Sequence, residues 1–554
     1  MTVALAGLLA LSAGPAFAQT AAQTTTQTPS VLDAPELVQQ FQETITPDDL
    51  RAHLYLFADD LFEGRETTTR GQKLAAAYLA SQYMKLGLEP KGTVSEDAGP
   101  LATFYQPFTV YGRAFKGATL MMGGETVSTF APEEQTGNAY LTFGNRAEVS
   151  APVVFGGFGM ANETYDDFAA MAEAGIDYED KWLMMLSGSL ADLTDASSDR
   201  NKIRTLFRRG LPKGMLIVAG PDADVPAATA RALTGQTSGV GSLSLEEPGG
   251  GFAFPPVYVI SPDLADQILS AGGRSLDDTR DALVSTMQPV VFEVGAEATL
   301  SSSLTYETRA METENVIAYL EGSDAELKDE VVVLTSHYDH IGIDLTREGD
   351  QINNGADDDG SGTVSLIEIA EAFVEAKKAG YGPRRSILFM NVSGEEKGLL
   401  GSAYYADQEP MLPLEQTVAN LNIDMIGRFD PSHPTKSENY VYIIGSNLIS
   451  QELHDLNAQV NTLTGVDIEL DERFNSKDDP NQFYRRSDHW NFGKHNIPFI
   501  FYFTGTHEDY HQPGDEAHKV EYDRMARIAR LIFATAWQVA NQDERPAVSG
   551  TGFN

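Results

Sequence analysis

Histidines and an aspartate crowd the end of one apolar run. The stretch LTSHYDHIG follows VVV, so His337, Asp339 and His340 come directly after residues that are apolar enough to form a buried strand. More ionisable side chains follow later apolar runs or lie in polar loops: Asp358 in NGADDDGSG, Glu395 and Glu396 after SILFMNVSG, Asp424 after VANLNI, and His511 in HEDYHQPGD. These residue types bind metal ions and move protons.

Each of these groups has an ordinary structural explanation when it is taken alone. A single histidine is usually structural, an acidic loop is usually solvated, and an acidic pair before a helix is favourable at the helix N-terminus. Carboxylates that converge at one place repel one another, however, unless cations neutralise them. Because the chain has 0 cysteines, its metal ligands would be histidine, aspartate and glutamate. This donor set predicts a catalytic pair of zinc ions that share one carboxylate and lie about 3.5–4 Å apart.

The elements that position these groups alternate from about residue 313 onward. VIAYLEG, VVVLTSH, SILFMNVSG and VANLNIDMIG are typical of strands, and VSLIEIAEAFVEAKKAG is typical of a helix. Near-continuous apolar strands that alternate with helices predict an α/β fold with a mixed, mainly parallel sheet sandwiched by helices. Ligands of such sheets bind beyond the carboxyl ends of the strands. We therefore expect His337, Glu395, Glu396 and Asp424 along one edge of the sheet.

Two other regions differ from this segment. Residues 47–88 carry two helical patterns, the second of which ends near Gly87. Between about residues 131 and 290, short β-like runs such as APVVFGGFG and GMLIVAG alternate with Gly- and Pro-rich connections, which indicates a separate, strand-rich module. The predicted division is a signal peptide (1–18), a flexible leader (19–45), the first part of the main domain (46–130), the strand-rich insertion (131–290) and the rest of the main domain (291–545).

Length, charge and the first residues restrict the classes of function. A chain of 554 residues is long enough for two domains, or for one domain with a large insertion. Its formal net charge of −41 argues against nucleic-acid or membrane-surface binding, because an acidic surface repels phosphate groups. The segment MTVALAGLLALSAGPAFA ends in an A-x-A site at Ala18, which predicts export to the periplasm or the medium, although no Lys or Arg precedes its apolar part.

The acidic loop also fits a calcium-binding pattern. Asp357, Asp359, Ser361, Gly362 and Glu368 have the spacing of the first, third, fifth, sixth and twelfth positions of an EF-hand loop. The preceding stretch GDQINNGA cannot supply the incoming helix that an EF-hand needs, so calcium is the weaker interpretation. A serine nucleophile is weaker still, because no G-x-S-x-G turn lies between a strand and a helix.

Over roughly residues 313–540 the chain resembles the secreted two-zinc exopeptidases. This family includes bacterial leucyl aminopeptidase, aminopeptidase Y and the glutamate carboxypeptidase and transferrin receptor branch. The resemblance rests on SHYDH, NGADDDGSGT, SGEEKGLLGS, NIDMIG, RRSDHWNF and DYHQPGD, which occur in the family's order. The insertion is similar to the protease-associated domain that many members carry. The resemblance implies a zinc exopeptidase fold and peptide substrates.

The resemblance also implies a complete set of metal ligands. His337 and Asp424 would bind one zinc ion, and Glu396 and His511 would bind the other. Asp358, the middle acid of the DDD run, aligns with the bridging carboxylate. Two Zn²⁺ ions per chain are therefore expected.

Further residues receive catalytic or neighbouring roles from the resemblance. Glu395 aligns with the general base that takes a proton from a zinc-bridged water. Asp339 would accept the free imidazole N–H of His337 and set its tautomer. Asp488 and Tyr484 are candidates for the substrate side of the pocket. The family offers no role for His340, and we expect it at the surface or behind the metal ligands.

The resemblance implies an aminopeptidase, which removes N-terminal residues from peptides. A carboxypeptidase or dipeptidase is the alternative, and it would need a basic pocket for which Arg485 and Arg486 are the candidates. A glutaminyl cyclase is weaker, because such enzymes typically work with one zinc ion. A non-catalytic binding protein is disfavoured, because no ligand position has been lost.

Overall fold

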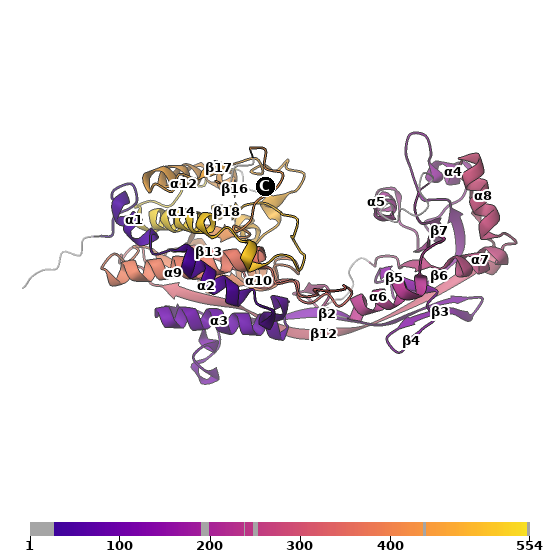
Figure 1. The fold of residues 1–554 in the computed structure, drawn as a ribbon, viewed down its shortest axis with the longest axis horizontal. Coiled ribbons are helices and arrows are strands. Elements are labelled where there is room, and N and C mark those ends of the chain that lie inside the picture. The colour runs from indigo at the N-terminus through magenta and orange to yellow at the C-terminus, as the bar shows by residue number, and fades with distance from the viewer. Residues whose placement is uncertain (1–26, 190–198, 238, 248–252, 436–438, 551–554) are drawn as a thin grey trace, which may run out of the picture.

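The computed structural model describes residues 27–189, 199–237, 239–247, 253–435 and 439–550. Two lobes lie at the ends of a long antiparallel ribbon that is made by β2 (Tyr105–Met122) and β12 (Thr299–Leu320) (Figure 1). The N- and C-terminal parts of the chain form one lobe, and the middle of the chain forms the other. The short strands on the ribbon are β1 (Glu89–Pro90), β3 (Glu125–Ala131), β4 (Glu134–Gln135) and β9 (Leu243–Ser244).

The first lobe contains a mixed, mainly parallel sheet, which confirms the predicted fold class. Its strands lie in the order β12, β14, β13, β15, β18, β16, β17. The four central strands are parallel to one another: β14 (Ser386–Val392), β13 (Val331–His337), β15 (Thr417–Ile423) and β18 (Phe499–Phe503). β16 (Tyr440–Ile444) runs antiparallel to β18, and β17 (Glu469–Asp471) completes that edge.

Helices cover both faces of this sheet, which explains why its central strands are buried along their whole length. Every residue of β13 is buried, with Val332 and Leu334 in one core and Val331 and Val333 in the other. The first core is covered by α1 (Pro35–Gln42), α2 (Pro47–Phe57), α3 (Arg70–Leu86), α9 (Gly362–Lys378), α12 (Gln451–Leu463) and α14 (Tyr522–Asn541). The second core is covered by α10 (Leu400–Asp407) and α13 (His489–Gly493).

The N-terminal segment is partly as predicted. Helices α2 and α3 match the two helical patterns, and α3 is followed by Gly87, whose φ of 80° is left-handed. The prediction of a flexible leader through residue 45 is wrong for its described part. Residues 35–42 form α1, in which Val38 and Phe41 are buried and Phe41 stacks on Trp537 with ring centroids 5.9 Å apart. The predicted signal peptide, residues 1–18, lies outside the described residues.

The second lobe contains the predicted strands together with helices, so it is an α/β module. Its sheet order is β11, β6, β7, β8, β10, β5. The strands are β5 (Ala139–Phe143), β6 (Glu148–Gly156), β7 (Trp182–Leu186), β8 (Gly214–Val218), β10 (Val257–Ile260) and β11 (Val291–Glu293). The helices are α4 (Asp167–Glu173), α5 (Asp199–Arg209), α6 (Val225–Thr237), α7 (Pro262–Ala271) and α8 (Leu276–Thr286).

The apolar runs in this module are strands as predicted, but the helices between them were not expected. The division at residues 131 and 290 stays a prediction, because β2 and β12 run without a break from one lobe into the other (Figure 1). Within the described part of the chain, no helix is both long enough and apolar enough to cross a bilayer.

Candidate metal centre

Four neighbouring parallel strands deliver ionisable side chains to one edge of the sheet. His337 is the last residue of β13, and Asp424 directly follows β15. Glu395 and Glu396 come shortly after β14, and His511 lies in the loop after β18. Because these strands are parallel, their carboxyl ends meet at the same edge, as expected for a ligand site in an α/β sheet.

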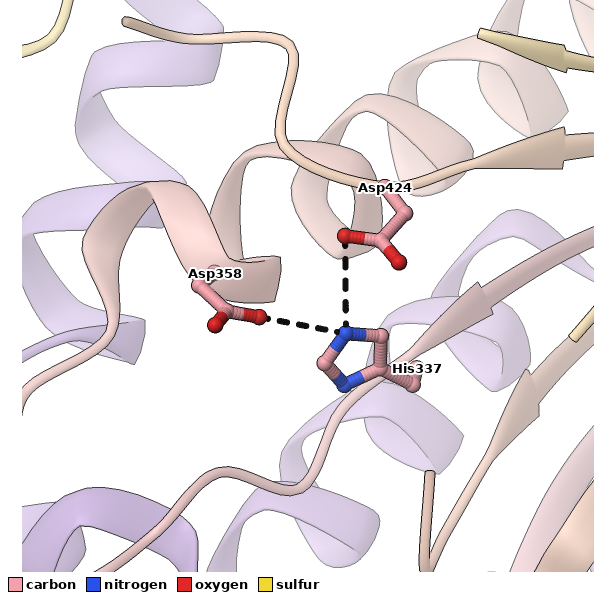
Figure 2. Close-up of side chains that lie close together, drawn as sticks. All are labelled: His337, Asp358 and Asp424. Carbon is pink, nitrogen blue, oxygen red and sulfur yellow. Dashed lines mark ion pairs between the residues drawn. The ribbon is translucent and has the colours of Figure 1, made fainter. Parts of the chain in front are cut away.

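Asp358 lies between two histidine-carboxylate clusters. Its Oδ1 is 3.3 Å from Nε2 of His337, which is also 3.7 Å from Oδ1 of Asp424. Figure 2 shows both carboxylates directed at the same ring nitrogen. The other oxygen, Oδ2, is 3.1 Å from Nε2 of His511, and that nitrogen is 3.1 Å from Oε2 of Glu396. One carboxylate thus presents an oxygen to each cluster, which is the arrangement of a bridging ligand.

The two aspartates beside Asp358 have other partners. Oδ1 of Asp357 accepts hydrogen bonds from the Gly427 backbone N–H (2.6 Å) and the Ser361 hydroxyl (2.9 Å). Oδ1 of Asp359 accepts hydrogen bonds from the N–H groups of Gly362 and Met425. These bonds tie the acidic loop to the segment after β15. The carboxylates do not converge on one point, so the loop does not have the form of an EF-hand site.

Two residues that the sequence did not single out hold this loop in place. Arg65 is buried and donates hydrogen bonds to the backbone oxygens of Tyr338 (3.0 Å), Asn354 (2.7 Å) and Gly355 (2.8 Å). Asp515 is also buried, and its carboxylate accepts hydrogen bonds from the N–H groups of the first two aspartates of the DDD run (3.0 and 3.1 Å). Arg65 lies in EGRETTT and Asp515 in HQPGD, but position in the sequence alone does not reveal a contact across the fold.

Glu395 lies next to the first cluster, with Oε2 4.0 Å from Nε2 of His337. Burial raises the pKa of Glu395 well above its usual range, and the carboxylates of Asp424 and Glu396 add to this effect against the opposing influence of His337. For Asp358, burial acts in the same direction, but hydrogen bonds and charges of the histidines hold its pKa well below the usual range. Burial and neighbouring charges thus shift the pKa values of these two carboxylates in opposite directions.

Asp339 is placed differently from the expectation. Nδ1 of His337 is 3.0 Å from the backbone oxygen of Asp339, whereas the nearest carboxylate oxygen of Asp339 is 3.9 Å away. The carboxylate instead accepts hydrogen bonds from the Thr67 hydroxyl (2.7 Å) and the Glu395 backbone N–H (3.2 Å). The imidazole is thus oriented by a main-chain carbonyl, and the Asp339 side chain positions Glu395.

A cavity of about 40 Å³ opens beside the metal-ligand candidates. Its walls beyond the predicted metal ligands and base are largely apolar and aromatic, and they consist of Met425, Phe483, Arg486, Phe501, Phe503, Thr506 and Tyr510. Neither Asp488 nor Tyr484 is among these lining residues. Asp488 is fully buried and accepts a hydrogen bond from the Ser402 hydroxyl (2.5 Å). Tyr484 packs edge-on against Trp490.

His340 lies inside the site and not at the surface. Its side chain is 0% exposed, and Nδ1 is 2.7 Å from Oε1 of Glu396 and 3.8 Å from Oδ2 of Asp358. Nevertheless, neither ring nitrogen of His340 meets hydrogen-bond geometry with any partner, and the same holds for Oε1 of Glu396 and Oδ2 of Asp358. Buried polar atoms without partners are costly, so this set fits a bound cation. Nitrogen and carboxylate ligands without thiolate suit zinc.

Comparison with known proteins agrees with this geometry. Residues 315–536 match the profile described as Peptidase family M28. A probable zinc metalloprotease of Pyrenophora tritici-repentis (strain Pt-1C-BFP) is 30% identical over 273 residues, which cover 42% of this chain and 52% of that protein. A glutamate carboxypeptidase 2 homolog of Caenorhabditis briggsae is 23% identical over 427 residues, or 70% of this chain and 52% of that protein. The chain spans about half the length of each relative.

A solved structure shares the fold. The aminopeptidase from Aneurinibacillus sp. strain AM-1 superposes with a TM-score of 0.51 at 17% sequence identity, and the match covers 93% of this chain and 99% of that one. At this level of identity the likeness concerns the architecture alone. It covers both lobes, because the matched part includes nearly all of each chain.

Proposed function

Residues 315–536 belong to peptidase family M28, and from this premise we propose that the chain is a two-zinc aminopeptidase that removes N-terminal residues from peptides. One observation carries the proposal. The two oxygens of Asp358 face separate histidine-carboxylate clusters, at 3.3 Å from His337 and 3.1 Å from His511. A single zinc ion would need only one of these clusters.

The donor atoms divide into two sets around the shared carboxylate. His337 and Asp424 would hold one zinc ion, while Glu396 and His511 would hold the other. When bound, the ions supply Lewis acidity, which polarises a peptide carbonyl and lowers the pKa of water. Proton transfer and substrate positioning are assigned to side chains of this protein.

Glu395 is the proposed general base. It lies beside the first cluster, its carboxylate binds no backbone donor in the described structure, and its raised pKa favours uptake of a proton from water. Asp339 fixes the start of the Glu395 side chain by accepting its backbone N–H. Glu395 would take a proton from the attacking water and give it to the leaving amine.

The cavity supports an unblocked amine as the recognised end of the substrate. Four carboxylates line it, from Asp358, Glu395, Glu396 and Asp424, against one guanidinium, from Arg486. Bound Zn²⁺ would offset the charge of these carboxylates, and their remaining oxygen lone pairs can accept hydrogen bonds from a free amine, which a substrate carboxylate cannot donate. The walls formed by Met425 and three phenylalanines would accept an apolar side chain of the N-terminal residue.

Carboxypeptidase activity is the second candidate, because Arg486 lines the same cavity and is the kind of group that pairs with a terminal carboxylate. Arg486 is exposed, however, and its guanidinium lies over the ring of Phe483 at 4.9 Å from the centroid, with its Nη2 3.4 Å from the Tyr510 hydroxyl. An exposed cation at the rim binds a carboxylate more weakly than an enclosed one.

A substrate panel separates the two activities. The purified protein would be assayed on leucyl, phenylalanyl and glutamyl p-nitroanilides and on N-acetylated dipeptides, with and without 1,10-phenanthroline. We expect cleavage of the unblocked anilides, loss of activity with the chelator and recovery with added zinc. Cleavage of the blocked dipeptides alone would instead assign a carboxypeptidase, and full activity in the chelator would refute the metal-dependent proposal.

Export to the periplasm or the medium is also part of the proposal, and it is based on residues 1–18. N-terminal sequencing of the mature protein tests it. A chain that begins after Ala18 supports export, and an intact Met1 on protein from the cytoplasm contradicts it.

A further inference from the structure

His340 is placed in the metal centre by its backbone. Its N–H donates a hydrogen bond to the backbone oxygen of Arg65 (3.1 Å), and it forms a parallel bridge with Glu66. Gly355 leaves room for the ring, because a Cβ at this position would lie 2.5 Å from Cδ2 of His340. The ring therefore lies enclosed between two segments that are distant in the sequence.

The ring nitrogen Nδ1 is close to two carboxylates without being hydrogen-bonded to either. It lies 2.7 Å from Oε1 of Glu396 and 3.8 Å from Oδ2 of Asp358, and all three atoms are buried without a hydrogen-bond partner. A distance of 2.7 Å is that of an ion pair, yet these two atoms do not meet hydrogen-bond geometry with each other. Donor atoms that crowd together but do not aim at one another are expected where a cation lies between them.

His511 approaches the same two carboxylates. Its Nε2 lies 3.1 Å from Oδ2 of Asp358 and 3.1 Å from Oε2 of Glu396, and its ring centroid is 5.7 Å from that of His340 at an interplanar angle of 70°. The atoms of His340, Asp358 and Glu396 all fall within 4.8 Å of one another, which is compact enough for ligands of one ion.

We infer that His340 is a fourth protein ligand of the second metal site, together with Asp358, Glu396 and His511. This inference rests on the proposed two-zinc centre and extends it. Two histidines and two carboxylates would then surround the second ion, whereas the first site has three candidate protein ligands, His337, Asp358 and Asp424. With four protein ligands, the second ion would be held more tightly than the first.

Diffraction from the zinc-loaded wild-type protein tests the inference directly. With anomalous data at the zinc edge, Nδ1 of His340 should lie about 2.0–2.1 Å from the second ion. A separation above about 3 Å from an occupied second site would overturn the inference but leave the two-zinc proposal intact. A second site without zinc would overturn both.

Metal affinity gives a second readout that does not depend on activity. His340→Ala should weaken the tighter-bound zinc at least about tenfold in competition with a graded series of chelators. The matched control is His495→Ala, because His495 is an exposed histidine that pairs with Asp407 and should leave both affinities as in the wild type. His511→Ala provides the reference for the loss of one ligand. Wild-type zinc affinities in a folded His340→Ala protein would refute the inference, and the diffraction test stands if that variant does not fold.

Discussion

Asp515 should control both the stability of the acidic loop and its affinity for zinc. Its side chain is 0% exposed, and its carboxylate accepts the backbone N–H groups of Asp357 (3.0 Å) and Asp358 (3.1 Å). In Asp515→Ala these two donors lose their partner while they stay buried, at a cost of about 1–3 kcal/mol each. The variant also removes a buried carboxylate whose pKa is raised to about 6 by burial and by Asp357, which returns part of that cost.

The net loss expected for Asp515→Ala is therefore about 2–4 kcal/mol in the free energy of unfolding, measured in urea on metal-free protein. Because Asp515 also holds the backbone of the zinc-ligand candidate Asp358, zinc affinity should fall about 10–100-fold in chelator competition. Glu508→Ala is the control, since its side chain is 71% exposed in the same segment. If Asp515→Ala unfolds within about 0.5 kcal/mol of the wild type and keeps its zinc affinity, the loop is held by other contacts and the reasoning is wrong.

Three other perturbations test separate parts of the structure. Glu395→Gln should lower turnover of leucyl p-nitroanilide about 10²–10⁴-fold, because the amide cannot accept a proton. Elemental analysis should still find the wild-type zinc content. Loss of zinc would instead identify Glu395 as a metal ligand. Arg65→Met leaves the buried backbone carbonyls of Tyr338 and Gly355 without a hydrogen-bond donor and should lower the free energy of unfolding in urea by at least about 3 kcal/mol. A near-wild-type urea midpoint would contradict the role of Arg65 in holding the acidic loop. Burial raises the pKa of Asp167 to about 6, so the folded state holds this proton more tightly than the unfolded state does. Stability should accordingly decline from about pH 4 to above pH 6, by at most about 3 kcal/mol from this group. Asp167→Asn should flatten this decline in urea unfolding, and the exposed Asp180→Asn should not; an unchanged pH profile in Asp167→Asn would contradict the assignment.

The main sheet was predictable because its signal is local. The strands β13, β14, β15 and β18 are buried on both faces, so each is rich in apolar residues and lacks the alternation of a half-exposed strand. Helix α1 was not predictable in the same way. It has only 8 residues after a polar low-complexity stretch, and it is stabilised by packing such as that of Phe41 on Trp537, which lies almost at the other end of the chain.

The sequence by itself predicted the kinds of donor atom and the edge of the sheet that they occupy, but it did not place His340 among them. Residue type sets the ligand chemistry, and parallel strands bring their carboxyl ends to one edge. Only the tertiary structure decided where each side chain points within that edge. Three adjacent aspartates have the same chemistry, and Asp358 is the one that faces the histidines because contacts from Arg65 and Asp515 set the course of the loop. These contacts span 290 and 157 positions of the chain, so no local pattern carries them, and the burial of His340 against Glu66 and Gly355 depends on the same long-range packing.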